Sequence, residues 1–280
     1  MYVTDIHGIE WKHNKIYEIA SSSKPDVVIN GGDMLTFKGN LLHQNKFITD
    51  FLDDYFSKFE SKGIYYLGML GNDDLRIFDD LFQKTCNKYS YVFNMAQKKF
   101  RIDGSKYEFI GMNWIPDLPF GLKDRARKDT KDFELPKQFG KQYLSISNGW
   151  NKIENWVSYI ENLPTIEDEL NALVKPFDMS NTIYIFHSPP SNLDLDITFS
   201  GLKVGSKAEY EFLKKHQPKL SFHGHIHESP DVSGKWYSQV GKTICIQPGQ
   251  SQQNKNYLSY VLVDLENMNM ERKIIDNAFT

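Results

Sequence analysis

The sequence is poor in cysteine, has no long apolar run and carries no excess of positive charge. Its 280 residues include only Cys86 and Cys245, which give no disulfide framework; this fits a reducing compartment and predicts a cytoplasmic protein. No run of about 20 apolar residues occurs, so no membrane-spanning helix is expected. The first residues lack the basic start and apolar region of a signal peptide. A net charge of −3 and a pI of about 6.2 provide no general attraction for nucleic acid.

Histidine, in contrast, is locally concentrated. Three of the eight histidines, His223, His225 and His227, fall within five residues. In an extended strand such alternating positions project from one face, and imidazole is the commonest protein ligand for transition metals. The cluster therefore predicts a metal site, and the remaining ligands must come from elsewhere in the chain. Two further histidines, His13 and His43, are expected at the surface.

Ligand-type side chains also follow apolar segments at four other places. Strands predicted near residues 2–4, 25–30, 64–70 and 181–186 run, in that order, into Asp5 and His7, Asp33, Asn72, and His187. The carboxyl ends of strands are where α/β proteins build their sites. Each residue alone has an ordinary alternative, as a helix N-cap, a turn residue or a hydrogen-bonded core histidine. Because the arrangement occurs five times in one chain, coincidence explains it poorly.

The number and type of these side chains indicate two metal ions. Four histidines, two aspartates and one asparagine are too many for one ion, and for two ions one carboxylate must bridge. Nitrogen and oxygen ligands without thiolate suit Mn, Fe, Zn, Ni or Co better than Ca or Mg, and we favour Mn or Fe. Two ions roughly 3.5–4 Å apart hold and acidify a bridging water and neutralise the oxygens of an in-line displacement at phosphorus.

In chain order these residues resemble the five sequence blocks of the calcineurin-like metallophosphoesterase superfamily. The blocks are Asp5-x-His7, Gly32-Asp33, Gly71-Asn72-x-Asp74, His187 and Gly224-His225-x-His227. The resemblance implies a four-layer αββα sandwich of two mixed β-sheets flanked by helices. It also implies one metal held by Asp5, His7, Asp33 and His227, and a second held by Asp33, Asn72, His187 and His225.

The resemblance is not to the protein serine/threonine phosphatases. Their signature Gly-Asp-x-x-Asp-Arg-Gly is absent, since Met34-Leu35-Thr36-Phe37 follows Asp33. The segment His187-Ser188-Pro189-Pro190 is similar to the small prokaryotic-type phosphodiesterase branches. The family pattern does not require His223, which we predict to support the ligands from behind.

One position departs from the family pattern. Many members have a histidine after the asparagine, where it contacts the phosphate and protonates the leaving group; this chain has Asp73. We assign Asn72 and Asp73 as catalytic. An ionised Asp73 repels a phosphate, unless the metals offset its charge or burial keeps it protonated. General-acid help, worth roughly 10²–10⁴-fold, is then reduced, and a diester carries one negative charge fewer than a monoester. We therefore predict phosphodiesterase activity above monoesterase activity.

The whole chain, residues 1–280, is predicted to form one metallophosphoesterase domain with an insertion or lid at 117–149. The insertion mixes glycine, proline and isolated aromatic residues with charges of both signs. These charges predict a solvated face rather than a phosphate-binding patch; they are Lys123, Asp124, Arg125, Arg127, Lys128, Asp129, Lys131 and Asp132. Residues 150–173 are predicted to be helical, with a break near Pro164.

Together these features predict a metal-dependent phosphohydrolase acting on a phosphate ester, most simply a phosphodiesterase in which a hydroxide bridging two metals attacks phosphorus in line. A nuclease or a phosphomonoesterase on the same site is the alternative enzyme; the acidic pI and the lack of a basic stripe disfavour a nuclease. The non-enzyme alternative is an interaction scaffold with a vestigial metal site. Such relatives lose metal ligands, whereas all seven positions are filled here. No membrane partner is expected.

Overall fold

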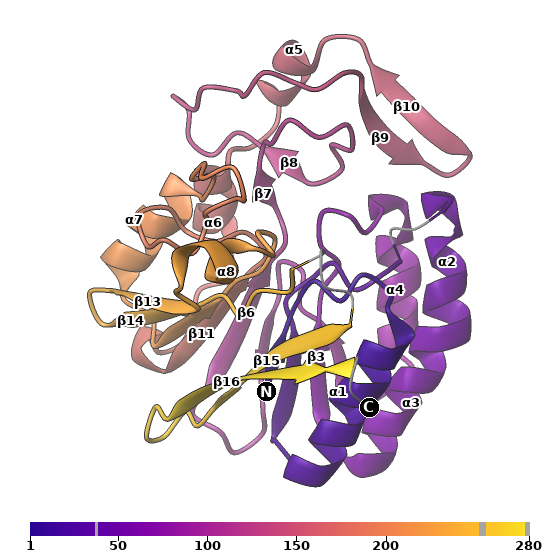
Figure 1. Cartoon of the computed structure of the whole chain (residues 1–280), viewed down its shortest axis with the longest axis vertical. Helices are drawn as coiled ribbons and strands as arrows, with labels where there is room; N and C mark the ends of the chain where they lie inside the picture. The colour runs from indigo at the N-terminus through magenta and orange to yellow at the C-terminus, as the bar shows by residue number, and fades with distance from the viewer. Residues whose placement is uncertain (37–38, 252–255, 278–280) are drawn as a thin grey trace.

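Two mixed six-stranded β-sheets face each other in the computed structural model, which describes residues 1–36, 39–251 and 256–277 (Figure 1). Each sheet has four parallel strands and antiparallel strands at its margins. Helices cover the outer face of each sheet. This arrangement confirms the predicted αββα sandwich.

The first sheet contains the strands that end in Asp5, Asp33 and Asn72. Its parallel strands are nearly all apolar and buried, as expected for strands covered on both faces. In spatial order the sheet consists of β16 (Met270–Asp276), β15 (Tyr257–Val263), β1 (Tyr2–Val3), β2 (Val27–Asn30), β3 (Tyr65–Gly68) and β4 (Val92–Asn94). The sequence also predicts a pair of strands at residues 257–264 and 268–275, and this hairpin is present as β15 and β16, which pair antiparallel.

The second sheet contains the strands that lead to the other histidines. In spatial order it consists of β13 (Tyr237–Val240), β14 (Thr243–Ile246), β12 (Leu220–Phe222), β11 (Thr182–Phe186), β6 (Glu108–Met112) and β5 (Lys99–Arg101). The sequence of residues 89–100 also predicts a single strand, and this prediction is wrong. The chain turns after Asn94 and crosses from the first sheet to the second, so that β4 and β5 belong to different sheets.

Three apolar cores hold the layers together. The central core lies between the sheets and joins Ile29 of β2 to Ile183 of β11. The core outside the first sheet is covered by α1 (Glu10–Ser23), α3 (Asp53–Lys62) and α4 (Asp79–Cys86), and the core outside the second by α6 (Ile166–Ala172) and α7 (Lys207–His216). Figure 1 shows these two helical layers on opposite sides of the molecule.

The amphipathic pattern of residues 43–60 predicts one long helix, but the observed helix is not uniform. It consists of α2 (Gln44–Lys46), a π-helical stretch (Phe47–Leu52) and α3. Phe47 and Phe51 pack against the ring of His13, which is fully buried rather than at the surface. His43 is exposed, as expected. No helix in the described part of the chain combines the length and apolarity needed to cross a membrane.

The segment after β6 forms a separate layer at the top of the molecule in Figure 1. It contains β7 (Ile115–Pro116), β8 (Ala126–Arg127), β9 (Gln142–Ile146), β10 (Gly149–Ile153) and α5 (Trp156–Ile160). The prediction of a helix from residue 150 is wrong, because residues 150–153 pair with β9 as a hairpin. Gly149 after Asn148 is a hairpin signal that outweighs helix propensity here. The predicted break near Pro164 separates α5 from α6, and a capping box of Thr165 and Asp168 starts the second helix.

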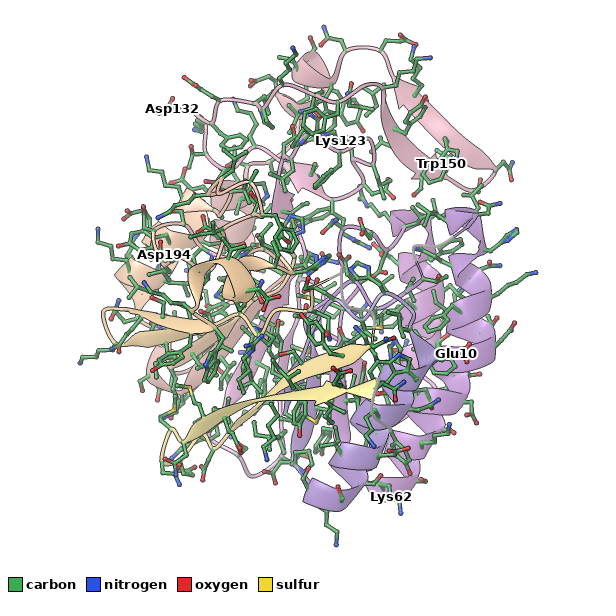
Figure 2. All side chains as sticks on the ribbon, viewed as in Figure 1. Glu10, Lys62, Lys123, Asp132, Trp150 and Asp194 are labelled. Atoms are coloured by element: carbon green, nitrogen blue, oxygen red, sulfur yellow. The ribbon has the colours of Figure 1, made fainter. Side chains whose placement is uncertain are left out.

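The prediction of a solvated charged face in the insertion is also wrong. Only Lys131 and Asp132 are exposed among its eight noted charges; the buried ones are Lys123, Asp124, Arg125, Arg127, Lys128 and Asp129. Figure 2 shows Asp132 at the outer edge of this layer and Lys123 within it. The buried charges are tolerated because each has a partner. Lys123 Nζ lies 2.6 Å from Asp117 Oδ1, and Arg127 Nε lies 3.2 Å from Glu169 Oε1.

Candidate metal centre

Two groups of ligand-type side chains meet where the parallel strands of both sheets end. One group is Asp5, His7, Asp33 and His227, and the other is Asp33, His187 and His225. All six are buried, and within each group the candidate ligand atoms lie within 4.8 Å of one another. Asp33 belongs to both groups. The loops after β1 and β2 therefore meet the loops after β11 and β12 across the interface between the sheets.

Asn72 lies against the second group. Its Oδ1 lies 2.8 Å from Nε2 of His187, so all seven predicted ligand side chains occupy one site. Asn72 itself comes from the loop after β3. The structure thus brings together the residues that the sequence placed at five separate strand ends.

Four of these residues have a left-handed backbone conformation, which residues other than glycine rarely adopt. The φ angles are 58° for Asp5, 51° for His7, 51° for Asp33 and 66° for His225. Hydrogen bonds between the loops hold this conformation: Asp5 N donates to Gly32 O at 2.9 Å, and His7 N donates to Asp33 O at 2.8 Å. Strain of this kind persists where the surrounding structure over-determines it, and it is common at functional sites.

The histidine cluster is not an extended strand. The strand β12 ends at Phe222, and His225 is left-handed. A side chain at Gly224 would place its Cβ 2.2 Å from Thr4 Oγ1, so the close approach to β1 requires glycine. The three histidines consequently do not share one face, contrary to the simplest interpretation of their spacing.

His223 is directed away from both groups of ligands. Its Nδ1 lies 2.9 Å from Ser188 O, and its Nε2 lies 2.8 Å from Ser221 Oγ. Burial lowers the pKa of His223 to about 3, so the ring is neutral. Because Ser188 follows His187 directly, His223 contacts the backbone that carries a candidate ligand.

The charges of the site are strongly coupled. Burial opposes protonation of His187, but the Asp33 carboxylate, with its Oδ2 3.4 Å from His187 Nε2, acts together with Asp5 and the carbonyl of Gly31 to outweigh burial and raise the pKa of His187 to about 9. The same contact, against the opposing effect of burial, lowers the pKa of Asp33. Burial lowers the pKa of His225 to about 3 and, with the nearby His227, the pKa of His7 to about 4. Two rings are therefore held neutral, the form that binds metals.

Several contacts in the site bring together pairs of acceptor atoms, which is favourable only if a cation lies between them. Nδ1 of His187 donates to Gly31 O at 2.9 Å, so in the neutral ring the lone pair of Nε2 faces the lone pairs of Asn72 Oδ1. Only a proton or a metal ion between them makes that contact favourable. Nε2 of His7 and Nε2 of His227 similarly lie 3.0 Å apart. Nε2 of His225 is buried without a hydrogen bond among the described residues. The donor set therefore fits two ions with nitrogen and oxygen ligands.

Asp73 lies on the open side of the site. Its side chain is 35% exposed, so a substrate can reach it. Oδ1 accepts from Asn72 Nδ2 at 2.9 Å, and Oδ2 lies 3.8 Å from His7 Nδ1. Desolvation and the charge of Asp33 raise the pKa of Asp73 to about 7. The carboxyl group is thus kept partly protonated near neutral pH in the metal-free chain.

Two residues that hold the ligand loops together were missed at the sequence level. The buried carboxylate of Asp74 accepts from Gly71 N at 2.8 Å, Met34 N at 3.1 Å and Leu35 N at 2.8 Å, which joins the loop of Asp33 to that of Asn72. Gln44 donates to Asp73 O at 2.8 Å and accepts from Leu75 N at 2.8 Å. Gln44 lies on a helix, and nothing in its local sequence indicates this role.

A family profile described as calcineurin-like phosphoesterase matches residues 1–229. The chain belongs to the calcineurin-like phosphoesterase family. Members of this family depend on two metal ions, and the buried His/Asp cluster is one that could bind them. As a calcineurin-like phosphoesterase, the protein is a phosphoester hydrolase by family.

Solved structures show the same calcineurin-like fold at low sequence identity. One, 19% identical, aligns over 97% of this chain and 96% of its own with a TM-score of 0.61. Another, the protein TT1561 of Thermus thermophilus, is 14% identical over 97% of this chain and 96% of its own, with a TM-score of 0.55. No curated protein matches the chain significantly.

Proposed function

We propose that the protein is a phosphodiesterase with two metal ions, Mn or Fe in preference to Zn, Ni or Co. The observation that carries the proposal is the pair of buried ligand groups that share Asp33. One ion would be held by Asp5, His7, Asp33 and His227. The other would be held by Asp33, Asn72, His187 and His225.

When bound, the two ions would supply an acidified water and positive charge for the phosphoryl oxygens. The protein's own residues would orient the substrate and protonate the leaving oxygen. Asn72, held against His187 by the contact of its Oδ1, would present its amide group toward a substrate oxygen. Asp73, which is partly exposed and has a raised pKa, would donate a proton from its protonated form to the leaving oxygen. Both catalytic assignments rest on the position of these side chains at the open side of the site.

Charge balance supports a diester over a monoester. Two divalent ions, the carboxylates of Asp5 and Asp33 and an attacking hydroxide would together leave one positive charge in the site. A diester brings one negative charge and would neutralise the site, whereas a dianionic monoester brings two, and the ionised fraction of Asp73 would repel it further. In the low dielectric of a buried site this difference is larger than in water.

His223 would act on the ligands through the backbone. Its hydrogen bond to Ser188 O supports the position of His187 from behind, away from the substrate. A cytoplasmic location belongs to the same proposal, because Cys86 and Cys245 are both buried free thiols. So does a single domain over residues 1–280, in which the segment 117–149 is an insertion that controls access to the site.

The test is an activity screen of the metal-reconstituted protein. Purified chain, stripped with chelator and reloaded with Mn²⁺, should hydrolyse bis(p-nitrophenyl) phosphate faster than p-nitrophenyl phosphate, and Asp33→Ala should hydrolyse neither. Preferential hydrolysis of single-stranded oligonucleotides would favour the nuclease, and a faster monoester rate the phosphomonoesterase. A wild-type chain that takes up no Mn²⁺ and hydrolyses none of these would support the scaffold.

A further inference from the structure

Two adjacent residues of the insertion, Asp124 and Arg125, bind the backbone of the loop that carries Asn72. The Arg125 guanidinium donates from Nε to Gly71 O at 2.7 Å and from Nη2 to Asp74 O at 3.4 Å. The Asp124 carboxylate accepts from Arg76 N at 2.9 Å. The two side chains thus bind backbone groups on both sides of Asn72 and Asp73.

We infer that Asp124 and Arg125 are positioning residues that fix Asn72 and Asp73 in the site. The inference deepens the proposed function and rests on it. It assigns to the insertion a direct part in building the second metal site, in addition to any control of access.

The Asp124–Arg125 pair is itself held rigidly. Arg125 is 2% exposed and makes two contacts with the Asp79 carboxylate, at 2.5 Å from Nη2 and 3.2 Å from Nη1. Asp124 also accepts from the N–H and the hydroxyl of Ser145, on β9. The arginine therefore joins the Asn72 loop to the start of α4, and the aspartate joins it to the hairpin of β9 and β10. Such a doubly anchored pair has little freedom to follow a shift of the loop.

The Asp124–Arg125 pair complements the hydrogen bonds that Asp74 and Gln44 make in the same loop. Asp74, itself a residue of the loop, accepts from Met34 N and Leu35 N, and Gln44 of α2 donates to Asp73 O. Removal of Arg125 would leave Gly71 O, which is buried, without this donor, and an unpaired buried carbonyl costs roughly 1–3 kcal/mol. Because Asp74 and Gln44 remain, the loop would loosen on one side rather than unfold.

The chemistry of the site makes it sensitive to such loosening. Asn72 offers a neutral amide oxygen, a weaker ligand than a carboxylate, so its binding depends on correct placement. Loss of residues that orient ligands typically lowers metal affinity by about 10–100-fold. Lysine at position 125 would keep the charge but not the planar set of donors that serves Gly71 O and Asp79 together.

The chain offers a matched control in Arg127. This arginine is also buried, and it lies on β8, two residues further along. It binds Glu169 and Ala126 O and stacks over Trp114, at 3.7 Å from the ring centroid. Within the described residues it makes no hydrogen bond to the 71–76 loop. Arg127→Gln therefore perturbs the insertion without removing a hydrogen bond to the loop of Asn72.

Two measurements on Arg125→Gln and Arg127→Gln test the inference. In metal-free protein, hydrogen–deuterium exchange of residues 71–76 should be faster in Arg125→Gln and unchanged in Arg127→Gln. On titration with Mn²⁺ alone, the first ion should bind Arg125→Gln as it binds wild type, and the second should bind about 10–100-fold more weakly. Arg125→Lys should fall between Arg125→Gln and wild type in both measurements.

Unchanged exchange and unchanged binding of both ions in Arg125→Gln would overturn the inference. The inference would also be overturned if Arg125→Gln and Arg127→Gln both lost affinity for both ions to the same extent, because that pattern would mean general destabilisation. A wild-type chain that binds no Mn²⁺ would instead overturn the proposed function. The exchange measurement would still report in that case whether Arg125 holds the loop.

Discussion

Nε2 of His187 lies 3.4 Å from Oδ2 of Asp33, while the opposite ring nitrogen donates to the carbonyl of Gly31. The imidazole thus connects the second sheet to the loop after β2 and, when protonated, forms a buried ion pair with the aspartate. This relationship makes the metal-free protein sensitive to pH in a defined direction.

The stability that His187 contributes should fall as the pH rises. Its pKa is raised from 6.5 to about 9 in the folded chain. A group whose pKa is higher in the folded chain than in the unfolded chain stabilises the fold fully at pH values below its unfolded pKa. This stabilisation is lost as the pH rises through the folded pKa. The difference in unfolding free energy between metal-free wild type and His187→Gln should therefore shrink by up to about 3 kcal/mol between pH 6.5 and 9. Urea denaturation at several pH values measures it, and a difference that is constant over this range would contradict the expectation.

Asp33 should matter to both ions, and His225 to one. Asp33 is common to both ligand groups, whereas His225 belongs only to the second. After loading with Mn²⁺ and gel filtration, elemental analysis should find two ions per chain in wild type and one in His225→Ala. Asp33→Ala should retain neither ion tightly. If Asp33→Ala retained one ion as tightly as His225→Ala does, Asp33 would not bridge.

Replacement of Asp73 by histidine should change the preference between substrates. Asp73→His removes a negative charge from the open side of the site and supplies the proton donor that many family members have. The ratio of monoester to diester hydrolysis should rise by about tenfold or more, within the range of general-acid effects. Asp73→Asn is the control, since it removes both the charge and the carboxylic acid without adding the imidazole donor. An unchanged ratio in Asp73→His would remove Asp73 from the mechanism.

A methyl group at position 224 should disturb the site through β1. In Gly224→Ala the new Cβ would meet Thr4 Oγ1 at 2.2 Å and Asp5 Oδ2 at 2.8 Å. Overpacking of this kind costs roughly 1–3 kcal/mol, and displacement of Asp5 should weaken binding of the first ion. Denaturation and Mn²⁺ titration measure the two effects. The double variant Thr4→Ala, Gly224→Ala should recover part of the stability; no recovery would mean that Thr4 is not the source of the clash.

The candidate metal ligands could be predicted from the sequence because each one lies within five residues of the end of an apolar strand. That signal is local, and the common edge of parallel strands brings local signals together. The roles of Gln44 and Arg125 could not be predicted, since their partners lie 29 and 54 residues away in the chain. Alternating charges in the insertion suggested solvation because the sequence pattern does not show that Arg127 meets Glu169, 42 residues further on.

The histidine cluster shows a different limit of the sequence. Its spacing indicated a site whose buried histidines and aspartates could bind metal ions, but the inferred extended geometry was wrong. The left-handed backbone at His225 follows from the contact of Gly224 with Thr4, which depends on how the two sheets pack. The helix prediction for residues 150–153 was wrong for a related reason, since their pairing with β9 overrides their local preference for a helix.

The contacts of Arg125 also bear on how this enzyme scaffold can be engineered. A protein engineer who wishes to admit bulkier substrates would naturally trim the upper layer as a detachable module. Excision of residues 117–149 would take Asp124 and Arg125 with it and, by our inference, weaken the catalytic loop that the change was meant to expose. Remodelling is better confined to the tip of the hairpin, where Ile146 is 44% exposed and Gly149 has open space around it.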